Sequence, residues 1–75
     1  MMLENVQEGI FGLKNLATGL VVESTADGSV RTADYNENGY QQWRFVKVEY
    51  GCFSLKNVAT GKYLDSNAEG KVYTL

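Results

Sequence analysis

The sequence predicts an all-β fold built from two copies of one repeated unit, and three observations support this. First, short runs rich in Val, Leu, Phe, Tyr and Thr alternate with turn residues: the 75-residue chain has eight glycines and no proline. Such runs between turns are typical of strands. Second, no window places apolar residues at the i, i+3, i+4, i+7 spacing of a helix. Third, the sequence repeats itself after 42 residues.

The composition pattern predicts seven strands, in chain order at residues 10–14, 20–24, 29–33, 43–49, 52–56, 62–65 and 71–74. The turns between them are predicted from two kinds of tripeptide. The first kind is Ala-Thr-Gly, at 17–19 and 59–61. The second kind is Ala-Asp-Gly at 26–28 and Ala-Glu-Gly at 68–70, and all four end in a glycine. Because glycine adopts positive φ without steric cost, these tripeptides are predicted to be hairpin turns.

The repeat is close in sequence. Residues 11–19 are Phe-Gly-Leu-Lys-Asn-Leu-Ala-Thr-Gly, and residues 53–61 are Phe-Ser-Leu-Lys-Asn-Val-Ala-Thr-Gly. The match continues without a gap from residues 21–32 to residues 63–74. A fixed period of this size indicates a repeated supersecondary unit.

We therefore expect a single domain over residues 1–75. It consists of copy one (1–33) and copy two (43–75), joined by a turn-rich loop (34–42). Alternation predicts core residues at eight positions, namely Leu13, Val22, Val30, Phe45, Phe53, Leu55, Leu64 and Val72. In copy one, Met1 stands at the position that Trp43 has in copy two.

The overall charge and the ends of the chain restrict the function classes. A net charge of −2, with the basic residues scattered among acids, argues against a nucleic-acid binder. No apolar run approaches the roughly 20 residues that span a bilayer, so no membrane insertion is expected. The first residues have neither a basic region nor a long apolar stretch, so no signal peptide is predicted in this chain.

Enzymatic and metal-dependent functions are not expected either. The chain has no histidine, so it cannot form a Ser-His or Cys-His pair. With one cysteine it can form neither an intrachain disulfide nor an ordinary zinc site, and no cofactor is predicted. Cys52 lies in a predicted strand beside Phe53, and we expect it to be a buried small hydrophobe.

The segment Gln41-Gln42-Trp43 resembles the Gln-x-Trp signature of the ricin-type β-trefoil lectins. The sequence of residues 55–67 is similar to the first hairpin of that family; it reads Leu-Lys-Asn-Val-Ala-Thr-Gly-Lys-Tyr-Leu-Asp-Ser-Asn. The resemblance covers residues 9–75. It implies β-trefoil-type units, in each of which the tryptophan, here Trp43, is a large buried anchor of the core. Three such units close one trefoil, and this chain encodes about two. It also implies a carbohydrate-binding, lectin-like function and a secreted protein, although the compartment stays open.

The resemblance also implies a set of sugar-binding residues. In that family, a carboxylate at the end of the second strand of each unit accepts hydrogen bonds from sugar hydroxyls. The residues at this position are Glu23 in copy one and Asp65 in copy two. Polar residues before the tryptophan complete the site, and an aromatic ring stacks on the sugar. The family's stacking position falls on Ala33 or Leu75, which cannot stack. The candidates to replace it are Tyr35, Tyr40 or, in copy two, Tyr73. The full expected set is Glu23, Asn36, Tyr40, Gln41, Asp65, Asn67 and Tyr73. The alternative role of both carboxylates is to cap local turns.

Two functions stay open at this point. The first is a lectin-like module with weak, multivalent sites for galactose or N-acetylgalactosamine type sugars. The second is a structural or protein-interaction domain that has lost sugar binding, as the missing stacking ring suggests. In either case two units leave strand edges unpaired, so we expect a homo-oligomer closed by association or strand exchange.

Overall fold

The computed structural model describes residues 9–49 and 52–75, and within them all seven predicted strands are present. They are β1 (Gly9–Phe11), β2 (Val21–Ser24), β3 (Val30–Ala33), β4 (Trp43–Glu49), β5 (Cys52–Asn57), β6 (Leu64–Ser66) and β7 (Val72–Thr74). The all-β fold class is therefore confirmed. The loop 34–42 contains one 3₁₀ turn, η2 (Gly39–Gln41), which the sequence pattern did not predict. The start of copy one, residues 1–8, lies outside the described residues.

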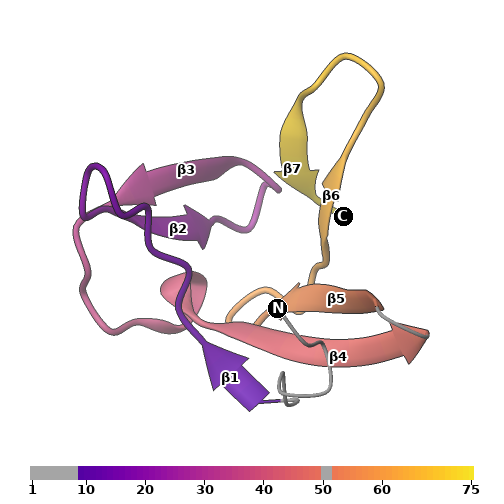
Figure 1. Cartoon of the computed structure of the whole chain (residues 1–75), viewed down its shortest axis with the longest axis horizontal. Coiled ribbons are helices and arrows are strands. Elements are labelled where there is room, and N and C mark those ends of the chain that lie inside the picture. The colour runs from indigo at the N-terminus through magenta and orange to yellow at the C-terminus, as the bar shows by residue number, and fades with distance from the viewer. Residues whose placement is uncertain (1–8, 50–51) are drawn as a thin grey trace.

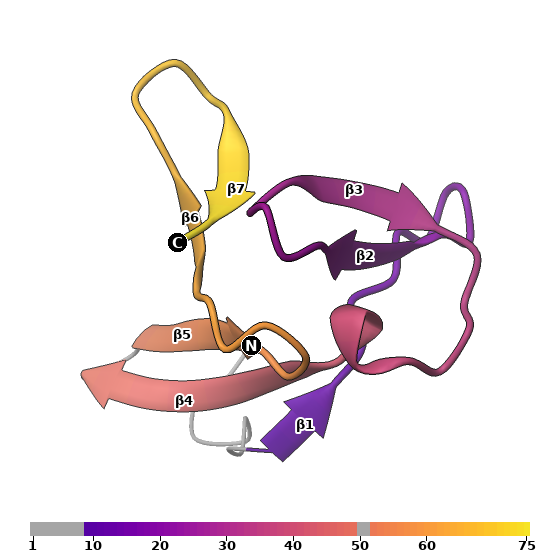
Figure 2. The ribbon, with the colours of Figure 1, turned by 180° about the vertical axis from the view of Figure 1, so that it is seen from behind.

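The strands form one three-stranded antiparallel sheet and two hairpins. The sheet has the order β1-β4-β5, and the hairpins are β2-β3 and β6-β7. In Figure 1 the sheet lies below both hairpins, and the β6-β7 hairpin projects away from it; Figure 2 shows the same arrangement from behind. The two hairpins have the same register after a shift of 42 residues, since Val22 pairs with Thr32 and Leu64 pairs with Thr74.

Strand β1 is shorter than the predicted strand 10–14. Only Gly9, Ile10 and Phe11 pair with β4. The chain then leaves this sheet and crosses to β2, where the Leu13 carbonyl accepts a hydrogen bond from the Val22 amide at 2.8 Å. A strand that changes its partner cannot continue one ladder, and this ends β1 at Phe11.

The hairpins of the two copies contact each other directly. The turn between β2 and β3 lies against β7, where the Thr74 amide donates to the Gly28 carbonyl at 2.9 Å. Beside it, the hydroxyls of Ser24 and Thr74 share a buried hydrogen bond of 2.8 Å. Gly28 has a φ of +88°, and a Cβ there would lie 2.7 Å from the Thr74 carbonyl oxygen. The backbones approach closely because this position has no side chain.

The buried core is small. Among the described residues, Trp43 and Val21 are the hydrophobic residues that are buried, and Trp43 is fully buried. Trp43 is held in place by its indole N–H, which donates to the Val22 carbonyl at 3.1 Å. The core prediction for Trp43 is thus confirmed.

The remaining predicted core positions are less covered than expected. Seven of the eight are half-buried, and Val72 is exposed at 47% of its surface, so its prediction as a core residue is wrong. The prediction that Cys52 is buried is also wrong, because its thiol is exposed. Cys52 starts β5 at the edge of its sheet, and Val72 lies on the projecting hairpin, so in neither place do other described residues form a further layer over the side chain.

Three phenylalanine rings lie together on the sheet. The rings of Phe11 and Phe45 meet edge to face with centroids 5.1 Å apart, and those of Phe45 and Phe53 lie 6.3 Å apart. Phe11 keeps 45% of its surface exposed, and the other two rings are half-buried. The sheet therefore holds an apolar cluster that the described residues cover only in part.

Candidate functional site

Gln41 connects the loop 34–42 to copy one. This side chain is buried, with 1% of its surface exposed. Its amide nitrogen donates to the Glu23 carboxylate at 2.9 Å and to the Asp34 carbonyl at 2.7 Å. Its amide oxygen accepts from the backbone N–H of Asn36 at 2.8 Å. All these bonds are made to groups of the chain itself, so the role of Gln41 is to hold Glu23 and the loop 34–42 in position.

The Glu23 carboxylate is buried and has a partner on each oxygen. One oxygen accepts from Gln41, and the other accepts from the Arg31 Nε at 2.6 Å in an ion pair. The hydrogen bond from Gln41, and then that from Arg31, lower the pKa of Glu23 below its ordinary value of 4.5, against the opposing effect of burial. Glu23 and Arg31 face each other directly in the β2-β3 register.

The loop before Trp43 is ordered by short-range hydrogen bonds. The Asn36 side-chain oxygen accepts from the Asn38 N–H at 3.1 Å, and the Asn38 oxygen accepts from the Tyr40 N–H at 3.0 Å. Asn38 is thereby the N-cap of η2. From the other side, the buried Asn57 donates its side-chain N–H to the Tyr40 carbonyl at 2.9 Å. Tyr40 itself is 41% exposed.

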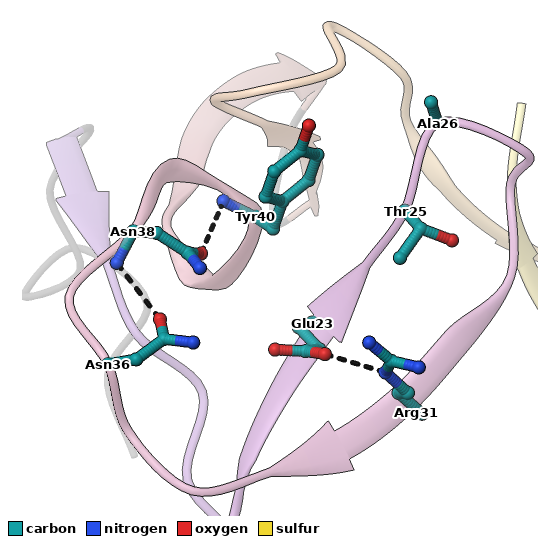
Figure 3. A pocket seen from close by; sticks show the side chains of 7 residues that line it. All are labelled: Glu23, Thr25, Ala26, Arg31, Asn36, Asn38 and Tyr40. Carbon is teal, nitrogen blue, oxygen red and sulfur yellow. Dashed lines mark hydrogen bonds and ion pairs between the residues drawn. The ribbon is translucent and has the colours of Figure 1, made fainter.

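These groups surround a surface hollow of about 450 Å³ (Figure 3). Its lining comes from the β2-β3 hairpin of copy one and from the loop 34–42, namely Glu23, Thr25, Ala26, Arg31, Asn36, Asn38 and Tyr40. Figure 3 shows the Tyr40 ring on one side of the hollow and the Glu23–Arg31 pair on the other. The hollow thus offers one aromatic ring together with hydrogen-bond donors and acceptors.

The structure brings four of the predicted site residues together. Glu23, Asn36 and Tyr40 line the hollow, and Gln41 supports it through Glu23. The sequence reasoning missed Arg31, Asn38 and Thr25. Arg31 could have been found from the predicted hairpin, because strands 20–24 and 29–33 around the turn place it opposite Glu23.

The other three predicted residues lie on the β6-β7 hairpin and not in this hollow. The Asp65 carboxylate is exposed and accepts from the N–H of Ser66 at 2.7 Å. Asn67 caps its turn, since its side-chain oxygen accepts from the N–H groups of Glu69 and Lys71. Tyr73 pairs with Asp65 across the hairpin and lines a different hollow, of about 310 Å³.

Within residues 9–49 and 52–75, no cluster of three or more His, Cys, Asp or Glu side chains has a metal-binding arrangement. In the same part of the chain, no helix is long and apolar enough to cross a membrane. Every buried side-chain nitrogen or oxygen described by the structure has a hydrogen-bond partner. The polar groups that remain for a ligand are therefore those on the surface.

The ion pair between the buried Glu23 carboxylate and the largely exposed Arg31 side chain predicts a pH dependence of stability. Because the pKa of Glu23 is lowered on folding, its contribution is present above pH 4.5 and is lost as the pH falls through the lowered pKa. We expect Glu23→Gln to destabilise the fold at neutral pH and to flatten the loss of stability on acidification. Urea unfolding at a series of pH values checks this. Asp65→Asn, which changes the equivalent exposed carboxylate, is the control, and an equal effect of both variants would contradict the prediction.

Two comparisons with known proteins bear on this site. Residues 39–74 match the family described as the ricin-type beta-trefoil lectin domain-like family. A comparison with curated protein sequences found no match. The predicted resemblance is thereby confirmed over η2, Trp43 and nearly all of copy two.

Proposed function

Because residues 39–74 carry a ricin-type beta-trefoil lectin domain-like sequence, we propose that this chain is a carbohydrate-binding, lectin-like module whose principal site is the hollow beside Tyr40. The observation that carries the proposal is the position of this hollow. It is formed where the loop before Trp43 meets the carboxylate at the end of β2, which are the two segments from which the resemblance draws sugar contacts.

Each group has a definite role in this proposal. The Tyr40 ring stacks on the apolar C–H face of the sugar, in place of the ring that Ala33 cannot provide. The side-chain amide N–H groups of Asn36 and Asn38 donate to sugar hydroxyls. The carboxylate of Glu23 accepts from hydroxyls through lone pairs that Gln41 and Arg31 leave free.

The proposed sugar is of the galactose or N-acetylgalactosamine type, as the resemblance implies. A shallow site with one stacking ring supports weak binding, and a millimolar Kd corresponds to only about −4 kcal/mol. Asp65, Asn67 and Tyr73 form a second, weaker site on copy two in this proposal. Useful avidity then requires several sites together, which a homo-oligomer of the chain provides.

A structural or protein-interaction role is the second candidate, and one observation favours it. Both oxygens of Glu23 and all of the Gln41 amide already bond within the chain. These contacts explain the residues without any ligand, since a buried polar group needs partners in every protein. Under this reading the hollow is a by-product of the loop geometry.

Sugar titration separates the two functions. We expect galactose or N-acetylgalactosamine to shift the amide resonances of Asn36, Asn38 and Tyr40 with a millimolar midpoint in NMR spectra. Tyr40→Ala should weaken this binding about fivefold, because stacking contributes roughly 1 kcal/mol. Tyr63→Ala is a matched control, since Tyr63 and Tyr40 are both 41% exposed. If no simple sugar moves these resonances, the lectin proposal is wrong and the interaction role is favoured.

A further inference from the structure

We propose that a second hollow, on copy two, binds an oxyanion, namely the sulfate or phosphate ester group of a ligand. This hollow has a volume of about 270 Å³, and its lining residues are Arg44, Lys56, Asn57, Val58 and Gly61. It shares no lining residue with the hollow beside Tyr40. Binding of an oxyanion here is therefore independent of the proposed sugar site.

Arg44 and Lys56 lie directly opposite each other on neighbouring strands. Arg44 is on β4, Lys56 is on β5, and the two residues are partners in the antiparallel register. The side chains of such a pair lie on the same face of the sheet, with their Cβ atoms about 4.5–5.5 Å apart. Like charges in this arrangement repel each other and destabilise the pairing. An oxyanion bound between the two cations offsets this repulsion, because it attracts both of them.

The chain itself does not neutralise this pair of charges within the described residues. Over residues 9–49 and 52–75, no carboxylate forms an ion pair with Arg44 or Lys56, whereas Glu23 forms one with Arg31. Lys62 also has an acceptor, since its ammonium group donates to the Ala26 carbonyl at 2.7 Å. The two cations on β4 and β5 therefore keep their N–H groups available for an anionic ligand.

The Lys56 side chain is held in place along its length. It is half-buried, and its Cε lies 3.9 Å from the point where a Cβ on Gly61 would stand. Its ammonium nitrogen lies 5.7 Å from the centre of the Tyr63 ring, and Tyr63 is also its backbone partner in an isolated bridge. Because an aromatic face attracts a cation, this contact orients the ammonium group before a ligand binds. Less side-chain freedom is then lost on binding.

The residues of this hollow match a tetrahedral oxyanion that carries a substituent. The guanidinium group of Arg44 can donate two parallel N–H groups to two oxygens, and the ammonium group of Lys56 can donate to a third. Val58 is 39% exposed and gives the hollow an apolar wall. A volume of about 270 Å³ has room for the oxyanion together with the first carbon atoms of the group that carries it. A sulfate or phosphate monoester therefore fits better than the bare ion.

The repeat provides an internal control for this site. The counterpart of Lys56 in copy one is Lys14, so both copies have a lysine at this position. The counterpart of Arg44 is Met2, and that of Tyr63 is Val21. Copy one therefore has neither the second positive charge nor the aromatic ring. A site that needs both cations is expected in copy two and not in copy one.

NMR titration of the full-length chain with sodium sulfate tests the site, with sodium chloride at equal ionic strength as the reference. We expect sulfate to shift the amides of Arg44, Lys56 and Gly61 saturably, with a Kd on the order of 10 mM. The amide of Asn38, in the other hollow, should stay in place. Chloride should not reproduce the shifts, because it has no oxygens to match the guanidinium fork.

Three variants of the chain sharpen the result. Lys56→Gln should weaken sulfate binding at least fivefold, because a charge-assisted hydrogen bond is lost. Lys14→Gln is the matched control and should leave the affinity unchanged. Arg44→Lys keeps the charge but loses the bidentate fork, so it should bind about threefold more weakly. Urea unfolding checks the fold, and we expect the midpoint of Lys56→Gln to equal or exceed that of the parent, because the repulsion between like charges is removed.

Two sugar esters distinguish the sources of the oxyanion. Galactose 6-sulfate and galactose 6-phosphate are titrated beside inorganic sulfate and inorganic phosphate, with galactose as the neutral control. We expect the better-fitting ester to bind about tenfold more tightly than its inorganic ion, because its carbon atoms contact Val58. The order of the two esters then identifies the source. Galactose should leave the amides of Lys56 and Gly61 in place.

Two results would overturn the oxyanion site. One is an equal loss of sulfate binding in Lys14→Gln and Lys56→Gln, which would reduce the effect to general attraction by surface charge. The other is the absence of a saturable shift up to about 100 mM sulfate. Neither result affects the sugar site, which is tested by galactose and Tyr40→Ala. Conversely, sulfate binding at Lys56 without any galactose binding would support the oxyanion site and remove only the sugar site.

Discussion

Trp43→Ala is expected to unfold the chain or to lower its free energy of unfolding by about 3–5 kcal/mol. Trp43 is fully buried and is one of only two buried hydrophobic residues that the structure describes. It also connects the two copies, because its ring lies at the start of β4 while its N–H is bound to the Val22 carbonyl on β2. In a domain of this size such a loss approaches the total stability.

The measurement is urea unfolding followed by far-UV circular dichroism, because Trp43 is the only tryptophan and the variant has no indole fluorescence. Trp43→Phe is the matched control. It keeps most of the apolar volume and loses the hydrogen bond to Val22, so we expect a smaller cost of about 1–3 kcal/mol. A Trp43→Ala variant within about 1 kcal/mol of the parent would show that the core does not depend on this ring.

Gly28→Ala is expected to destabilise the fold by about 2–4 kcal/mol, which combines two costs. An alanine at the φ of +88° is strained, and its Cβ would lie 2.7 Å from the Thr74 carbonyl oxygen. That oxygen belongs to the backbone of β7, so relief of the clash requires the two hairpins to separate. The buried hydrogen bond between Ser24 and Thr74 would be lost in this movement.

Gly70→Ala separates the two costs. Gly70 has a φ of +84° and no described atom within 4 Å of the added Cβ, so only the backbone strain applies, at about 1–2 kcal/mol. The difference between the two variants in urea unfolding measures the contact between the copies. Equal destabilisation of both variants would mean that the β2-β3 turn and β7 are not packed against each other in solution.

The strands were predictable because they depend on local sequence. Runs of β-branched and aromatic residues end at turns in which Gly28 and Gly70 adopt positive φ, and neither feature needs a distant partner. The β2-β3 hairpin and its Glu23–Arg31 pair follow from the same local rules, because turn and register determine which residues face each other. The part of the candidate site that lies on the β2-β3 hairpin could therefore be predicted from the sequence.

The rest depends on contacts between distant segments. Alternation predicts which face of a strand is apolar, but the exposure of Cys52 and Val72 depends on whether another layer lies above that face. The pairing of Gln41 with Glu23 joins residues 18 positions apart and follows from the way the loop 34–42 folds back over β2. Local sequence patterns do not determine how this loop folds back.

Residue type and spacing alone were enough to predict the all-β class, the strands and the 42-residue repeat, and the resemblance of the Gln41–Trp43 segment predicted the buried tryptophan. The folded arrangement was needed to show that Gln41 and Glu23 bond to each other beneath a hollow and that Asp65 lies exposed on a projecting hairpin. This difference arises because equivalent residues of the two copies meet different neighbours. Glu23 is covered by the segment that follows copy one, and within the described chain no such segment covers Asp65.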